Sequence, residues 1–180
     1  YKYPILENLI INRDIPPTAR AEFRTYSDEE LKRLNAEIVK MNEQIARLMI
    51  LHQMLGTRIS DTLTLRTDCL RGQPGDRVHP YEKPVSEEIA ILIERSIQYT
   101  KKKWGETEYI FVSDSDPSLP AQYNRIQTQV VQMIREKDLR DDYGRLFGFG
   151  THMYRHYYGV KCIWMIGQSQ DYWDTAAFTM

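Results

Sequence analysis

Apolar residues recur at helical spacing through most of the chain, and capping residues mark points where helices begin. Ser27 and Glu30 have the spacing of a capping box, in which the serine hydroxyl accepts the Glu30 amide and the glutamate reaches back to the cap. Leu31, Leu34 and Ile38 follow three or four residues apart, which is the spacing of one helical face. The pattern therefore predicts a helix that begins after Ser27.

The same periodicity predicts helices along most of the remaining chain. A strongly apolar stretch ends at Gly56, and glycine commonly ends a helix, so this stretch is typical of a core helix. Ser86 and Pro120 are residue types that favour a helix start, and Gly105 closes the segment that follows Ser86. The predicted helices are residues 41–55, 58–65, 86–103, 120–139 and 151–163, with a last short one near Thr175.

Two further segments favour extended structure. Residues 67–85 are rich in glycine, proline and charge, and they predict an irregular β-hairpin. Residues 109–113 combine aromatic and β-branched side chains and predict a short strand. We therefore expect a mainly α fold of the α+β class, in which the helices carry a small antiparallel sheet on one side.

The first 22 residues differ from the rest of the chain. Pro4, Pro16 and Pro17 interrupt them, and both proline and the residue before it resist helix formation. The chain begins at Tyr1 rather than methionine, which is typical of a fragment. We interpret residues 1–22 as a linker from a missing upstream domain, and residues 23–180 as one folded domain.

The composition limits the class of protein. With 42% hydrophobic residues the 180-residue chain is not disordered, and its net charge of −1 lacks the basic excess usual for a dedicated DNA binder. Cys69 and Cys162 have no CxxC spacing, so neither a disulfide framework nor a zinc site is predicted. Without a membrane-span pattern or signal peptide, we expect a soluble protein in the reducing cytoplasm.

Two groups of residues carry candidate chemistry. The first is Gly-Thr-Arg-Ile-Ser-Asp at residues 56–61, followed by Leu63, Leu65 and Asp68. The second is Thr-His-Met-Tyr-Arg-His at residues 151–156, followed by Gly167 and by Thr-Ala-Ala-Phe at residues 175–178. Either motif alone occurs by chance. Their order and helical contexts together resemble the catalytic domain of the tyrosine recombinase (phage integrase) family, over about Phe23 to Met180.

The resemblance implies DNA strand cleavage and rejoining through a 3′-phosphotyrosine link, with no metal or nucleotide cofactor. Arg58 and Arg155 would hold the scissile phosphate, because two guanidinium forks can stabilise the charge of a pentacoordinate transition state. His152 shares a helical face with Arg155 and would hydrogen-bond the phosphate or take the nucleophile's proton. Asp61 would pin the Arg58 guanidinium or brace the helix of the second motif.

The sequence departs from the family pattern at the position of the nucleophile. Phe178 stands where the family has its tyrosine, and a phenyl ring without a hydroxyl cannot attack phosphate. We therefore interpret the chain as an inactive Tyr-to-Phe form, engineered to hold intact DNA, with a naturally degenerate paralogue as the second interpretation. Tyr172 is the nearest other tyrosine, but it precedes the expected position.

Two other family positions also differ. Val78 lies about where the family has its hairpin lysine, the general acid for the leaving oxygen, and Lys83 or His79 would replace it. Gln168 occupies the position of a histidine or tryptophan, and its amide can donate a hydrogen bond to phosphate but cannot carry a proton. Loop residues near 78 and 163 are fewer than in the family pattern.

The remaining basic residues are candidates for DNA contacts. Lys101, Lys102 and Lys103 end a helix, where lysines are favoured by the helix dipole. The residues that we predict to contact DNA are Arg145, Lys161 and Thr151. The resemblance implies double-stranded DNA as partner, and a tetramer or dimer of this chain on it.

The predicted function is therefore DNA recombination or integration by a mobile-element integrase or transposase in the nucleoid-associated cytoplasm. Three alternatives stay open: a DNA-binding module without catalysis, DNA relaxation of the type IB topoisomerase kind, and a helical interaction domain with chance motifs.

Overall fold

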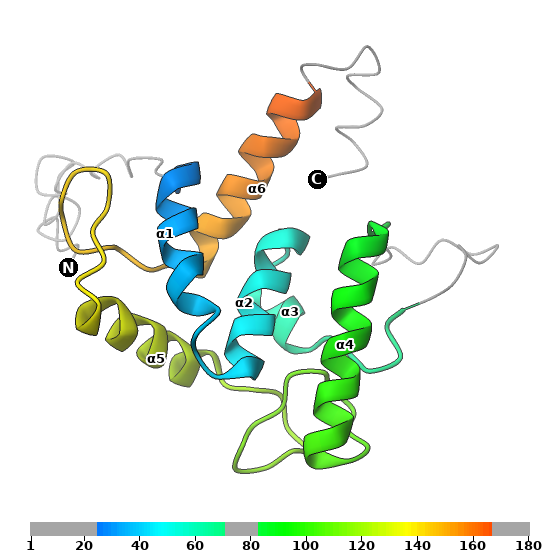
Figure 1. Cartoon of the computed structure of the whole chain (residues 1–180). Coiled ribbons are helices and arrows are strands. Elements are labelled where there is room, and N and C mark those ends of the chain that lie inside the picture. Colours follow the sequence, from blue (N-terminus) through cyan, green and yellow to red (C-terminus); the bar gives the residue numbers. More distant parts are fainter. Residues whose placement is uncertain (1–24, 71–82, 167–180) are drawn as a thin grey trace, which may run out of the picture.

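The structure is a computed structural model that describes residues 25–70 and 83–166. The helices in these ranges are α1 (Asp28–Ile38), α2 (Glu43–Leu55), α3 (Ile59–Leu63), α4 (Glu87–Trp104), α5 (Tyr123–Glu136) and α6 (Thr151–Ile166). α2 packs against α1, α3, α4 and α6, whereas α5 contacts α1 and α3 (Figure 1). The predicted mainly helical fold is confirmed.

The N-terminus of α1 is the predicted capping box. The Ser27 hydroxyl accepts the Glu30 amide at 3.1 Å, and the Glu30 carboxylate accepts the Ser27 amide at 3.0 Å. Leu31, Leu34 and Ile38 are buried, as their spacing predicts. α1 therefore presents its apolar face to the core.

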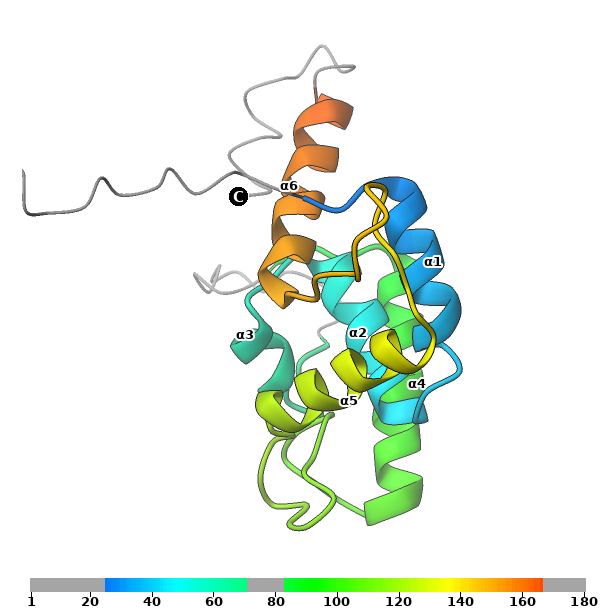
Figure 2. The ribbon, with the colours of Figure 1, turned by 90° about the vertical axis from the view of Figure 1, so that its left-hand side faces the viewer.

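α2 begins later than predicted and ends where predicted. Asn42 is its N-cap, with its side-chain oxygen accepting the Gln44 amide at 2.9 Å, so the helix starts at Glu43 rather than at residue 41. Gly56 ends it with a φ of +61°, a left-handed conformation that favours glycine. The central position of α2 in Figure 2 is consistent with its fully buried Leu48, Met49 and Leu51.

The predicted antiparallel sheet is not found in the described ranges, which contain isolated bridges instead. Tyr109 pairs with Arg66, and Val112 pairs with Pro120. Residues 109–113 therefore bridge to two different segments, through a single residue pair in each case. Proline has no N–H with which to extend a ladder. Most of the predicted hairpin at residues 67–85 lies outside the described residues.

The remaining helix boundaries follow the capping chemistry. α4 has Ser86 as its N-cap and Gly105 after its end, as predicted. α5 begins at Tyr123 rather than Pro120, because Pro120 takes part in the bridge with Val112. α3 is shorter than predicted, and α6 continues to Ile166. The predicted linker at residues 1–22 and the short helix near Thr175 lie outside the described residues.

A buried tyrosine fixes the loop that leads into α6. The Tyr26 hydroxyl accepts the Gly150 amide at 2.9 Å and lies 3.3 Å from the Gly148 carbonyl oxygen. Its ring stacks on Phe147 and meets Tyr154 edge-on, both at 5.1 Å between ring centroids. The first turn of α6 is thereby anchored to the start of α1.

Candidate functional site

Arg58 stands at the start of α3 with its side chain exposed. It is the N-cap residue, and its carbonyl accepts the amides of Asp61 at 3.0 Å and Thr62 at 3.1 Å. Its guanidinium makes no ion pair with any residue in the part of the chain that the structure describes. The backbone therefore fixes the base of this side chain and leaves its planar donor group available to an anion.

The second motif forms the first turns of α6. His152 is exposed and Arg155 is partly buried, and their spacing of three residues puts them on one face of the helix. The rings of His152 and His156 meet edge-on at 4.3 Å. Desolvation, followed by the charges of His152 and Arg155, lowers the pKa of His156. This end of α6 therefore gathers imidazole and guanidinium donors.

Lys83 reaches the same region from the segment before α4. Its ammonium group donates to the Leu55 carbonyl at 2.6 Å and to the Tyr158 hydroxyl at 3.1 Å. Burial lowers the pKa of Lys83, and the nearby Arg155 charge adds to this, while the Cys162 thiol acts in the opposite direction. Lys83 therefore lies within electrostatic reach of Arg155, at the C-terminal end of α2.

A buried histidine in α2 connects α3 to α6. His52 is 1% exposed, and its Nδ1 lies 2.9 Å from the Thr62 hydroxyl of α3. Its Nε2 lies 3.3 Å from the carbonyl oxygen of Thr151, the first residue of α6. Burial lowers the pKa of His52, and the Thr151 carbonyl and the Asp61 carboxylate oppose that effect. Both motifs are thus attached to the last turn of α2.

Two of the predicted site residues have other contacts. Asp61 is exposed, and its carboxylate accepts the Ser60 hydroxyl at 3.2 Å rather than the Arg58 guanidinium. Thr151, predicted to contact DNA, is buried, and its hydroxyl lies 3.4 Å from that of Tyr123. Neither the pinning role of Asp61 nor the DNA contact of Thr151 is tested by these contacts.

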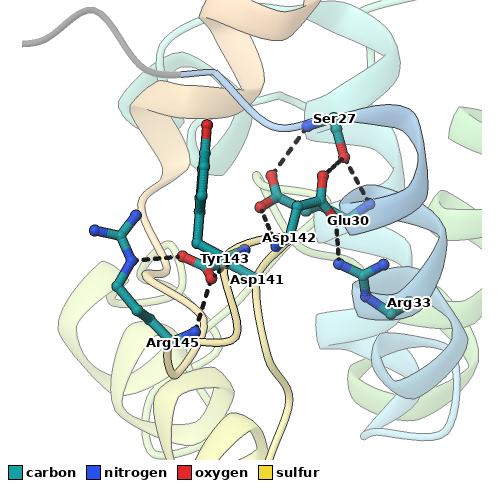
Figure 3. Close-up of polar contacts among 7 residues, drawn as sticks. All are labelled: Ser27, Glu30, Arg33, Asp141, Asp142, Tyr143 and Arg145. Carbon is teal, nitrogen blue, oxygen red and sulfur yellow. Dashed lines mark hydrogen bonds and ion pairs between the residues drawn. The ribbon is translucent and has the colours of Figure 1, made fainter.

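Arg145 lies on the loop between α5 and α6. A set of polar contacts holds this loop in place. Asp141 is buried and accepts the Arg145 amide at 2.9 Å and its Nε at 3.2 Å. Glu30 accepts the Asp142 amide at 3.1 Å, which ties the loop to α1. Figure 3 shows Asp142 turned toward α1, with Arg33, while Arg145 points away from α1. The Arg145 side chain is 65% exposed.

Lys161 lies further along α6 and forms an ion pair with Asp28 at 2.7 Å. The hydrogen bond from the Lys161 ammonium group, together with one from the Tyr157 hydroxyl, lowers the pKa of the Asp28 carboxyl group. Lys161 therefore contacts the first turn of α1 in this structure.

Several predicted residues lie outside the described ranges. They are His79, Val78, Gln168, Tyr172 and Phe178.

The sequence interpretation missed His52 and its partner Thr62. The pattern around His52 is that of an apolar core helix, and the only available signal was a histidine in its last turn, four residues before Gly56. Burial of a polar ring requires hydrogen-bond partners, so this position could have been marked as a contact between helices.

Three curated proteins are similar to this chain. Transposase B from transposon Tn554 of Staphylococcus aureus, in strains Mu50 and N315, is 28% identical over 165 residues. Transposase B from transposon PsiTn554 of Staphylococcus aureus is 27% identical over the same length. The matches cover 86% of this chain but only 26% of each relative, so the chain spans about a quarter of the proteins that it resembles.

The other comparisons give no match: no family model and no solved structure is significantly similar. None of the helices in residues 25–70 and 83–166 has the length and apolar character that a membrane crossing requires.

Proposed function

We propose that this chain is the catalytic domain of a mobile-element transposase or integrase of the tyrosine recombinase type, acting on double-stranded DNA. The similarity to Transposase B supports a transposition role. The observation that carries the proposal is the meeting of both motifs at the C-terminal end of α2, where His52 contacts the α3 segment after Arg58 and the residue before His152. These contacts support a shared site for residues that are far apart in the sequence.

The proposed reaction is a transesterification at phosphorus. A tyrosine hydroxyl at position 178 would attack the phosphodiester, form a 3′-phosphotyrosyl bond and displace the 5′ oxygen of the next nucleotide. Arg58 and Arg155 would donate to the non-bridging oxygens, on which negative charge grows in the transition state. His152 would accept the proton of the nucleophile. A 5′-hydroxyl from a partner strand then reverses the reaction and exchanges the strands.

Lys83 is the proposed general acid for the leaving 5′ oxygen. Its two contacts, with Leu55 and Tyr158, use two of the three ammonium protons and leave one for the substrate. Its lowered pKa favours proton donation, because a general acid works best when its pKa lies closer to the working pH.

Phe178 makes this chain a binding form of the enzyme. Without the hydroxyl no covalent bond to DNA forms, whereas the phosphate-binding arginines remain, so the chain binds DNA and leaves it intact. We propose an engineered Tyr-to-Phe change as the origin of this residue. The working assembly in this proposal is a tetramer or dimer on DNA in the nucleoid-associated cytoplasm, with an upstream domain that closes around the duplex.

The test is a covalent trap. The Phe178→Tyr variant is incubated with a library of duplexes that carry a nick within randomised sequence, and products are separated under denaturing conditions. We expect a protein–DNA species that survives denaturation with the variant and is absent with the original chain. No such species on DNA that is demonstrably bound would favour a non-catalytic binding module. Relaxation of supercoiled plasmid without strand exchange would favour the type IB topoisomerase alternative.

A further inference from the structure

We propose that His52 is a positioning residue that holds the Arg58 segment and the His152–Arg155 segment in register through one directional chain of hydrogen bonds. The inference rests on the proposed function, because it assigns His52 a role in placing the groups that would bind the scissile phosphate.

The direction of the hydrogen bonds follows from their end point. The Thr151 carbonyl oxygen can only accept, so His52 carries its proton on Nε2 and donates over 3.3 Å. Nδ1 is then an acceptor, and the Thr62 hydroxyl, 2.9 Å away, donates to it. The Thr62 oxygen in turn accepts from the Thr57 hydroxyl at 2.8 Å. The Thr62 hydroxyl also lies 3.4 Å from the Arg58 carbonyl, but its single proton serves the shorter contact with Nδ1.

The two ends of this chain lie next to the proposed catalytic residues. Thr57 immediately precedes Arg58, and Thr151 immediately precedes His152. The Thr151 carbonyl is also the α-helical acceptor for the amide of Arg155, one turn later. A movement of α3 relative to α6 would therefore break a buried hydrogen bond at His52, so the network resists changes in the separation of the two arginines.

The location of the ring makes the network sensitive to substitution. His52 is 1% exposed and Thr62 is fully buried, so water cannot replace a lost partner. The Tyr154 ring meets the imidazole edge-on at 5.9 Å and limits its orientation. An aliphatic residue would fill this site and satisfy the apolar pattern of α2, but it would supply neither hydrogen bond.

Another buried polar residue of α2 provides a matched control. Gln44 is 8% exposed, and its Nε2 donates to the Val112 carbonyl at 2.8 Å, so it also joins α2 to a segment distant in sequence. This bond does not lead to either motif. Gln44→Leu therefore removes a similar buried polar contact without disturbing the proposed phosphate site.

The experiment measures single-turnover cleavage at saturating nicked duplex in the Phe178→Tyr background, at a temperature well below the unfolding of every variant. We expect His52→Leu to reduce the rate by roughly ten- to a hundredfold, the effect of a small misplacement of catalytic groups. Gln44→Leu should stay close to the parent rate, and the Kd for the duplex should be similar for all. A general loss of packing would reduce the cleavage rates of both variants to a similar extent.

Two further variants keep the test decisive where His52→Leu folds poorly. Thr62→Val preserves shape and removes the hydroxyl. The loss of cleavage rate that it causes should shrink when Arg58→Ala is also present, because the Thr62 hydroxyl then has no arginine to position. Equal costs with and without Arg58 would overturn the proposal, as would equal rates for His52→Leu and Gln44→Leu. If the Phe178→Tyr parent forms no product, the proposed function fails instead. An imidazole NMR spectrum showing the His52 proton on Nδ1 would contradict the direction of the network.

Discussion

The side chain of Tyr158 in α6 packs closely against Gly56, the residue that ends α2. A Cβ at position 56 would overlap the Tyr158 ring, and the residue also has a φ of +61°. Gly56 is therefore required both by its backbone conformation and by the close approach of α6. The contact also places the end of α2 under the α6 turn that follows Arg155.

Gly56→Ala is expected to destabilise the fold strongly. Left-handed strain costs about 1–3 kcal/mol and overpacking about 1–3 kcal/mol, so the free energy of unfolding should fall by roughly 2–6 kcal/mol. Gly144 is the control, because its φ is +75° and nothing lies within 4 Å of a Cβ there. Urea unfolding should show a clearly smaller loss for Gly144→Ala. Equal losses would mean that α6 does not pack on Gly56.

The pH dependence of stability should report the buried His52. Burial lowers the pKa of His52 in the folded state below its ordinary value of about 6.5. The neutral ring is therefore favoured by folding: its contribution is complete above about pH 6.5 and is lost as the pH falls toward the folded pKa. Urea unfolding between about pH 7.5 and pH 5 should show a smaller loss of stability in His52→Gln than in the parent. The lowered pKa values of Asp28 and Asp142 act at lower pH. Identical slopes for the two proteins would contradict a neutral buried ring.

The proposed phosphate-binding arginines should affect cleavage more than binding. In the Phe178→Tyr background, Arg58→Ala or Arg155→Ala should each reduce cleavage by about a hundredfold or more, since each removes a donor aimed at developing charge. Binding should change little, because many phosphate contacts share it. Lysine should restore little activity at either position, since a point charge cannot replace a two-pronged contact.

Arg66 serves as the control for the two arginines. It follows α3 closely but pairs with Asp68 and Glu108 on the surface. Arg66→Ala should cleave at about the parental rate. Near-parental rates for Arg58→Ala and Arg155→Ala, in folded protein, would remove both residues from the proposed site.

Arg145 should contribute to binding rather than to chemistry. Its side chain is exposed on a braced loop, as expected for a backbone phosphate contact. Removing one phosphate contact should lower the log–log salt slope of DNA affinity by about 0.9. We expect this change for Arg145→Gln and none for Arg47→Gln, whose guanidinium pairs with Glu43 at the opposite end of α2. The same slope for both variants would exclude Arg145 from the interface.

The helices of the fold were largely predictable from the sequence. Ser27, Ser86 and Gly56 mark helix ends through local chemistry, and the structure confirms each of them. The expected sheet is not confirmed: in the described ranges residues 109–113 form only isolated bridges, whose formation depends on where Arg66 and Pro120 lie in space. Local composition carries no information about such long-range partners.

The candidate site could be predicted only as a set of residue types. Arg58, His152 and Arg155 were expected from their motifs, but the sequence gives no distance between them. His52 was missed because its pattern is that of a core helix, and its role depends on Thr62 and Thr151 from two other helices. Buried polar contacts between segments distant in sequence require the folded structure.

The most direct test of the proposed function is the identification of the bond between protein and DNA. Adduct from the Phe178→Tyr variant is digested with nuclease and protease, and the modified peptide is sequenced by mass spectrometry. The proposed chemistry predicts a nucleotide attached through its 3′ phosphate to the hydroxyl at position 178, with a free 5′-hydroxyl on the released strand. Attachment at Tyr172, linkage through a 5′ phosphate, or no modified peptide from bound DNA would contradict it.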